Sequence, residues 1–253
     1  YSDSTAFIDE GSIISDNRAV LGGGLYNRNG QMSIFDSTIS NNQATKGGGA
    51  TNNAGDLVIK RSTVSANSAS TYGGGINNFI GTLNIVNSTL SGNSSAGAGG
   101  AIFFKNPPVP VTLTNATISN NTAASNSGSG VYGATGSATL ENSIIANNSS
   151  GSANCAQNGF VVFSTANNNW FDDISCNGVN LGNPQLGPLA DNGGLTRTHA
   201  LLSGAGPIDK GSDSVCNSLP VSGKDQRRRS RNEGSHCDIG AYEREQSSMF
   251  IVP

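Results

Sequence analysis

An internal repeat occupies most of the first 150 residues of this chain of 253 residues. Its clearest form is Ser-Thr-aliphatic-Ser-x-Asn, as in residues 62–67, and the central aliphatic residues are separated by 25, 25, 26, 28 and 27 residues. These six aliphatic residues are Ile14, Ile39, Val64, Leu90, Ile118 and Ile145. A period of this size is typical of a solenoid, in which each turn buries its apolar face only against its neighbours.

Two further segments recur in register with this motif. An alternating apolar pair precedes it, such as Leu57 and Ile59, and a glycine cluster such as Gly73–Gly75 follows it. Runs with period-two alternation between Gly, Asn and Ser turns predict short strands, three per repeat, without helices. We therefore predict an all-β fold for residues 1–148, a right-handed parallel β-helix with three faces and about 25 residues per coil. Its regular part would be about 30 Å long, at about 4.8 Å per coil.

One asparagine in each repeat occupies the same position. Asparagine tolerates left-handed backbone, and its amide can bond to the asparagines of the coils above and below. We expect a structural ladder rather than a ligand site, formed by Asn17, Asn42, Asn67, Asn93, Asn121 and Asn148.

The repeat dissolves in residues 149–253, which contain all four cysteines. Three pairings are possible, and the simplest joins neighbours, Cys155 with Cys176 and Cys216 with Cys237. No cysteine has a partner at metal-ligand spacing, so structural disulfides and an extracellular or cell-surface location are favoured. We expect this region to be an irregular, disulfide-containing cap packed on the solenoid.

Composition and the distribution of acids exclude several classes of function. The net charge of −3 offers no electrostatic footprint for nucleic acid, and no apolar stretch is long enough for a membrane span. Outward positions of the coils are mainly Ser, Thr and Asn, and adjacent acids occur only at Asp9–Glu10 and Asp172–Asp173. We therefore predict no catalytic site, no metal site and no cofactor, and treat His199 as structural rather than as a base. A carbohydrate-active enzyme, a polysaccharide lyase or glycoside hydrolase, is the alternative, since β-helices of this kind often carry such sites.

The Thr-x-Ser pairs that flank the aliphatic residues predict a flat column of hydroxyl groups on one outer face. We interpret these pairs as ordinary solvated strand positions, and an ice-binding solenoid is the lesser alternative. The pairs are Thr38 and Ser40, Thr63 and Ser65, Thr89 and Ser91, and Thr117 and Ser119.

Charged residues concentrate in the non-repetitive region. Six of them could build a metal site, but buried Asp–Arg pairs and turn caps are the simpler interpretation. The arginine-rich run 227–231 is interpreted as a solvated loop, with binding of an anionic polymer as the alternative. The six residues are Asp191, Arg197, Asp209, Asp225, Arg227 and Asp238.

The order of motifs in this region resembles a known family. Residues 183–202, 207–211, 225–227 and 237–243 closely resemble, in sequence and order, the C-terminal block of bacterial choice-of-anchor Q surface proteins. The resemblance covers about residues 183–243. It implies a preceding right-handed parallel β-helix of the pectate-lyase-like superfold and a secreted or surface-attached protein.

From these features we expect a non-catalytic extracellular protein, such as a stalk, an adhesin or a self-assembling fibre subunit. Its partners would be other copies of itself, or a surface polysaccharide or protein. Head-to-tail assembly could join the strand around Phe7 and Ile8 to an apolar tail, because an open strand edge is a template for pairing. The tail consists of Met249, Phe250, Ile251 and Val252.

Overall fold

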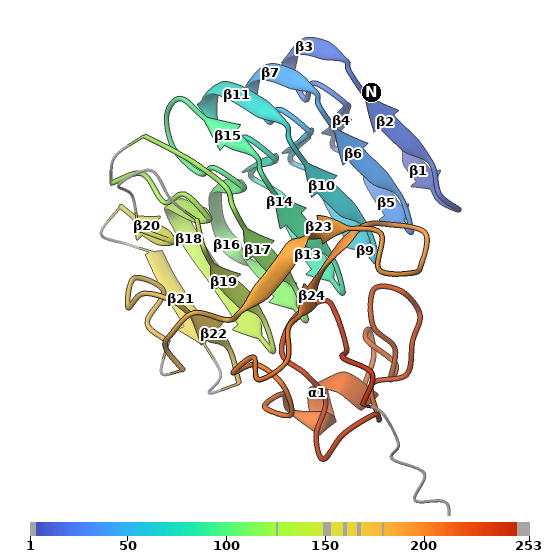
Figure 1. Cartoon of the computed structure of the whole chain (residues 1–253). Helices are drawn as coiled ribbons and strands as arrows, with labels where there is room; N and C mark the ends of the chain where they lie inside the picture. The colour runs from blue at the N-terminus through green and yellow to red at the C-terminus, as the bar shows by residue number, and fades with distance from the viewer. Residues whose placement is uncertain are drawn as a thin grey trace, which may run out of the picture.

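The computed structural model describes residues 4–124, 126–148, 153–158, 161–165, 168–178 and 180–246. About six turns of parallel β-solenoid form a rod, and the later residues lie along one side of it (Figure 1). This confirms the predicted all-β parallel solenoid. No helix among the described residues is long and apolar enough to span a membrane.

Each of the first three coils has four short strands, one more than the sequence predicts. They are β1 (Thr5–Ile8), β2 (Ile13–Ser15), β3 (Arg18–Leu21) and β4 (Leu25–Arg28), then β5 (Gln31–Phe35), β6 (Thr38–Ser40), β7 (Gln43–Lys46) and β8 (Ala50–Asn53), then β9 (Asp56–Lys60), β10 (Thr63–Ser65), β11 (Ser68–Tyr72) and β12 (Ile76–Phe79). The additional strands, β3, β7 and β11, follow the asparagine position. One alanine in β11 is their only buried residue, and none of the three strands alternates apolar with polar residues in the way that identifies a strand in sequence.

The later coils fuse two strand positions into one. The remaining solenoid strands are β13 (Thr82–Val86), β14 (Thr89–Ser91), β15 (Ser94–Ser95), β16 (Ile102–Thr114), β17 (Thr117–Ser119), β18 (Val131–Glu141), β19 (Ile144–Ala146), β20 (Cys155–Gln157), β21 (Val161–Thr165) and β22 (Trp170–Phe171). One half of β16 pairs with β12 and the other half with β13, so four strand positions form three parallel sheets of 11, 7 and 4 strands. Stacking continues beyond residue 148, because β21 pairs with β18 and β22 with β19.

The core is a column of apolar side chains inside the rod. Successive coils place one residue directly on the next, as Ile34, Ile59 and Ile85 show, and all three are fully buried. In the first coil the inward residues Ile8 and Ile14 are only half-buried, because the described residues place no coil above them. At the other end the Cys155–Cys176 disulfide joins the core.

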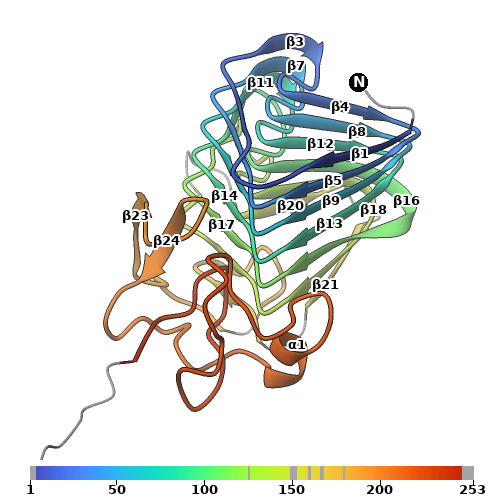
Figure 2. The same cartoon turned by 90° about the vertical axis from the view of Figure 1, so that its right-hand side faces the viewer.

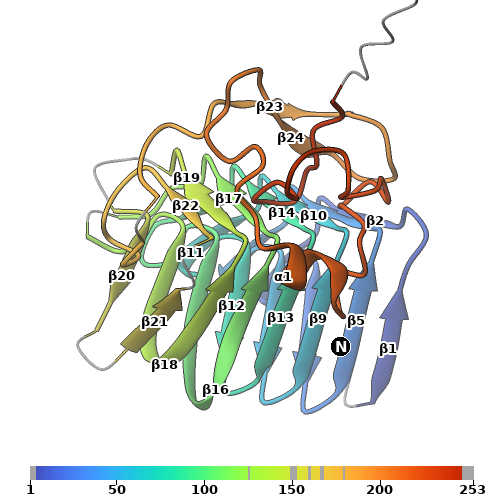
Figure 3. The same ribbon diagram turned by 90° about the horizontal axis from the view of Figure 1, so that it is seen from below.

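Residues 183–246, here called the C-terminal block, cover the side of the rod and not its end. The block contains the hairpin of β23 (Leu186–Ala190) and β24 (Thr198–Leu201), the short helix α1 (Asp213–Asn217) and long loops. It lies over the seven-stranded sheet that runs from β2 to β22 (Figure 3). Its Cys216–Cys237 disulfide, together with Cys155–Cys176, confirms the pairing of neighbouring cysteines.

Candidate functional site

The six repeat asparagines form one continuous column of side-chain hydrogen bonds. The Oδ1 of Asn67 accepts from both the backbone N–H and the Nδ2 of Asn42, at 2.9 and 3.0 Å. Its own Nδ2 donates to Asn93 Oδ1 at 2.9 Å. Two residues that the sequence did not indicate extend the column, since Asn148 donates to Asn154 and Asn154 to Asp172. All these amides are used inside the bend, which is a structural role.

A second, unforeseen asparagine column lies inside the sheet that contains β4, β8 and β12. Asn27 donates to Asn52 Oδ1 at 2.8 Å, and Asn52 donates to Asn78 Oδ1 at 2.7 Å. Each also donates to the carbonyl of a glycine three residues later. The signal in the sequence was an Asn-x-x-Gly spacing repeated once per coil, in Asn27–Gly30, Asn52–Gly55 and Asn78–Gly81.

The Thr-x-Ser face is not solvated, so this part of the sequence interpretation is wrong. Thr89 and Thr117 are 0% and 2% exposed, and Ser91 and Ser119 are equally hidden. The C-terminal block covers these positions from β10 onward, while Thr38 and Ser40 in β6 remain half-buried. A flat, hydrated hydroxyl array, as an ice-binding face requires, is therefore missing from these described coils.

Two residues of the block form hydrogen bonds with the side chains of this hydroxyl column. Gln226 accepts from Thr89 Oγ1 at 2.7 Å and donates to Thr63 Oγ1 at 3.0 Å. His199 contacts the Gly187 carbonyl through Nδ1 at 2.7 Å and Ser91 Oγ through Nε2 at 2.9 Å. Because a carbonyl can only accept, Nδ1 carries the proton and Nε2 accepts from the serine. Burial lowers the pKa of His199, so it is a neutral cross-link at this interface.

A corner column joins the block to five successive coils. Its residues precede the Ser-Thr motif, have positive φ, and are Asp36, Arg61, Asn87, Asn115 and Asn142. Asp36 is bound by Arg228 at 2.9 Å, Asn87 donates to the Lys224 carbonyl at 2.8 Å, and Asn142 accepts from the Ser212 N–H at 2.8 Å. Burial opposes ionisation of Asp36, but hydrogen bonds from Arg61 and Arg228 outweigh it and lower its pKa. The sequence signal that could have indicated this column is a polar residue repeated at this position in each coil.

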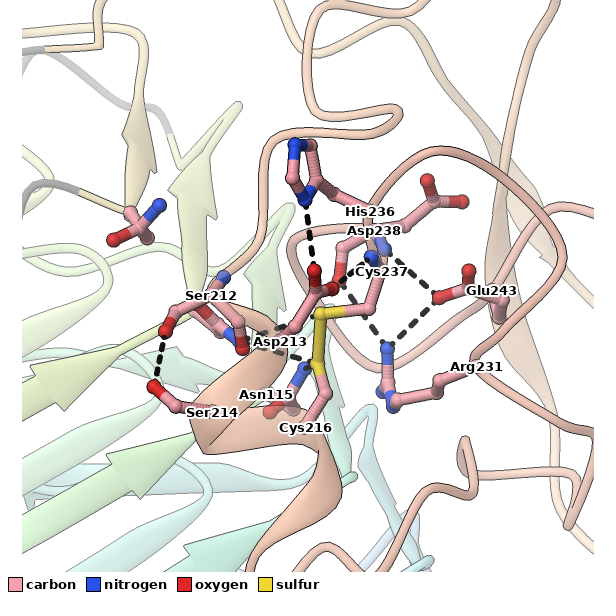
Figure 4. The surroundings of a disulfide bond; sticks show 12 residues. Asn115, Ser212, Asp213, Ser214, Cys216, Arg231, His236, Cys237, Asp238 and Glu243 are labelled. Carbon is pink, nitrogen blue, oxygen red and sulfur yellow. Dashed lines mark hydrogen bonds and ion pairs between the residues drawn. A yellow bond between two sulfur atoms is a disulfide. The ribbon is translucent and has the colours of Figure 1, made fainter.

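A buried charged hub lies within the block, next to the Cys216–Cys237 disulfide (Figure 4). Arg231 is 0% exposed and contacts Glu243 at 3.3 Å, while Arg227 pairs with Asp225 at 2.8 Å. The expected solvated loop is therefore wrong for Arg227 and Arg231, although it holds for the exposed Arg228 and Arg229. Asp225 both pairs with Arg227 and accepts the Arg227 backbone N–H in a turn, which agrees with the simpler interpretation of the sequence.

The other charged residues of that interpretation do not converge. Asp191 caps a turn by accepting from the Gly193 N–H at 3.0 Å, and Asp209 accepts from Gln246 at 2.8 Å. Asp191 and Arg197 line a recess of about 620 Å³ where the block overhangs the first coils. Within the part of the chain that the structure describes, no group of three or more His, Cys, Asp or Glu side chains is placed to hold a metal ion.

Glu243 predicts an unusual dependence of stability on pH. Burial, reinforced by the charge of Asp238, raises the pKa of Glu243 to about 8. The folded protein then keeps a proton that the unfolded chain releases above its ordinary pKa of 4.5, so stability should fall as pH rises from about 5 to 8. The slope should approach about 1.4 kcal/mol per pH unit. Urea denaturation at several pH values measures it.

Glu243→Gln is the matched control for this prediction, because glutamine imitates the protonated acid. Its stability should fall less steeply with pH than that of the wild type, because Asp238, whose pKa burial also raises, is then the one remaining member of this pair that can keep a proton in the folded protein. Equal slopes for the wild type and the variant would show that another group titrates.

A groove of about 530 Å³ lies on a face that the block leaves free. It is lined by Leu21, Lys46, Thr51, Asn53, Tyr72, Asn77, Phe79, Phe103, Lys105, Ala134, Thr135 and Asn158. Figure 2 shows its strands β4, β8 and β12 in the upper part of the solenoid, and the block with its hairpin at the left and α1 at the bottom. The aromatic rings and lysines come from four strands, β7, β11, β12 and β16, and share no repeated motif, so a sequence pattern could not assemble them. None of the described lining residues is acidic.

The residues expected to mediate self-association are only partly placed. Phe7 is 69% exposed on β1, and Ile8 points toward the core. Met249, Phe250, Ile251 and Val252 lie outside the described residues. Head-to-tail assembly therefore stays a prediction.

Comparisons with known proteins do not assign the chain to a family. No protein-family model, no curated protein and no solved structure matches it.

Proposed function

We propose that this chain is a non-catalytic extracellular or cell-surface protein, a stalk or adhesin that presents the groove to a partner. The observation that carries the proposal is the chemistry of the groove lining, which combines two lysines, three aromatic rings and several amide or hydroxyl groups with no acid. Cleavage of a glycosidic bond by the usual routes needs a positioned acid and base. Such a lining is suited to binding without turnover.

The C-terminal block supports an extracellular setting for this function. Its motifs resemble those of choice-of-anchor Q surface proteins, and we propose membership of that family. Both pairs of cysteines are joined in disulfides, which persist mainly in oxidising compartments. The block shields the hydroxyl face of the rod, so binding by the coils is directed to the opposite side.

The test is a screen of uronate-containing and neutral polysaccharides for cleavage, with and without calcium. We expect no new reducing ends and no unsaturated products. Turnover that co-purifies with the protein and is abolished by Asp56→Asn or Asp172→Asn, both exposed acids, would overturn the proposal in favour of a carbohydrate-active enzyme. Surface exposure in the native host is measured by protease accessibility of intact cells.

A further inference from the structure

We propose that the groove is a binding site for a linear, anionic polysaccharide. The inference rests on the proposed non-catalytic function and adds the class of ligand and the residues that would recognise it. Four observations carry it, namely the shape of the groove, the register of its walls, its charge and the way its aromatic rings are used.

The shape of the groove follows from its glycine corner. The strands β7 and β8 meet at Gly47–Gly49, and Thr51 Oγ1 donates across the bend to the Lys46 carbonyl at 2.9 Å. A Cβ on Gly47 would lie 2.3 Å from that Thr51 oxygen, and Gly47 has φ of 65°. Only glycine permits so sharp a corner, which brings outward side chains of neighbouring strands toward each other.

The walls of the groove run along the axis of the solenoid. One wall places Leu21, Lys46 and Tyr72 on successive coils, each paired in register with the next. On the facing strands, Asn53, Phe79 and Lys105 are stacked in the same way. Successive rungs are about 4.8 Å apart, so the site repeats along several coils. A chain molecule laid along the axis would meet every rung, whereas a small ligand would meet only one or two.

The charge of the groove is opposite to that of the whole protein. The chain carries a net charge of −3, yet the described lining contains Lys46 and Lys105 and no carboxylate. The ammonium groups stand 5.7 Å from the Tyr72 ring and 5.6 Å from the Phe79 ring, so both are held at the groove by their aromatic neighbours. Lys46 and Lys105 lie two coils apart, and this spacing favours a ligand that carries repeated negative charges.

The aromatic rings favour a sugar polymer over a nucleic acid. Phe103 lies between Tyr72 and Tyr132, with ring centroids 4.4 and 5.6 Å away and both pairs stacked. Both faces of Phe103 are thus occupied, and a base cannot stack on them as single-stranded nucleic acid requires. The ring edges together with Thr51, Asn53 and Thr135 offer apolar contact beside hydrogen-bonding groups, the mixture that fits hydroxylated sugars.

The experiment compares two double variants of equal charge. Lys46→Gln with Lys105→Gln removes both cations of the groove, and Lys210→Gln with Arg229→Gln removes two exposed cations of the block. Binding to polygalacturonate and to heparin, with dextran as the neutral polymer, is measured by affinity electrophoresis and calorimetry. We expect the groove variant to bind the anionic polymers at least tenfold more weakly and the block variant to bind like the wild type. Unchanged thermal transitions confirm that both variants are folded.

Several outcomes would overturn this inference while leaving the proposed function intact. They are no binding of the wild type to either anionic polymer, equal weakening in both double variants, and tight binding of single-stranded DNA that depends on Lys46 and Lys105. Preference for polygalacturonate or for heparin would identify carboxylate or sulfate as the recognised group. Cleavage of a bound polymer would instead sink the proposed function.

Discussion

Arg231→Met will lower the free energy of unfolding by about 3–5 kcal/mol, because it removes one partner from a buried network of ion pairs and hydrogen bonds. The guanidinium donates to the carbonyls of Lys224, Asp238 and Gly240, to Glu243 Oε2 and to Asn87 Oδ1. Methionine fills a similar volume but offers none of these bonds. It also removes a buried cation whose charge favours the ionised form of Asp238.

Arg229→Met is the control, since Arg229 belongs to the same arginine run but is 57% exposed and pairs with the exposed Glu245. Its effect should stay within about 0.5 kcal/mol. Urea denaturation of both variants measures the difference. Similar losses in the two would mean that Arg231 has no special part in holding the block, contrary to its contact with Asn87 on the coils.

Asn67→Ala will destabilise the protein by about 4 kcal/mol, because it interrupts the asparagine column in its buried middle. The backbone N–H of Asn42, one N–H of its amide and the Ile39 carbonyl all lose their bond to Asn67. Each buried polar group left without a partner costs about 1–3 kcal/mol. The thermal transition should therefore move far below that of the wild type.

The same substitution at the exposed end of the column provides the comparison. Asn17→Ala removes side-chain bonds to Asn42 and Ser15 that solvent can replace, so its cost should stay below about 1 kcal/mol. Calorimetry of both variants gives the two transition temperatures. If Asn17→Ala proved as damaging as Asn67→Ala, burial would not be what makes the column stabilising.

The interior of the solenoid could be predicted because it is periodic. Each coil has an aliphatic residue at the same inward position, as Ile39 and Val64 show, and this position identifies a strand. The asparagine three residues later identifies a bend. The strand β7 escaped prediction because its side chains alternate without a consistent apolar face. The period shows which residues point inward, and this information was enough to predict most of the fold.

The exterior could not be predicted in the same way. Thr63, Thr89 and Ser91 looked solvated because nothing near them in sequence covers them, and their partners Gln226 and His199 lie 108 to 163 residues away. The block has no repeat, so its sequence does not show which of its residues lie against which coil. The groove could not be predicted either, since its lysines and rings lie on several strands and belong to no common motif.

The corner column has a mechanical consequence. A bare solenoid could lose coils one after another under tension, because each coil contacts only its neighbours. Here the block grips five coils, from Asp36 to Asn142, and its own loops are closed by the Cys216–Cys237 bond. A force along the axis would act on all the contacts between the block and the coils at once, as shear, and would not separate one coil at a time. The section of the rod that the block covers would then unfold in a single abrupt event.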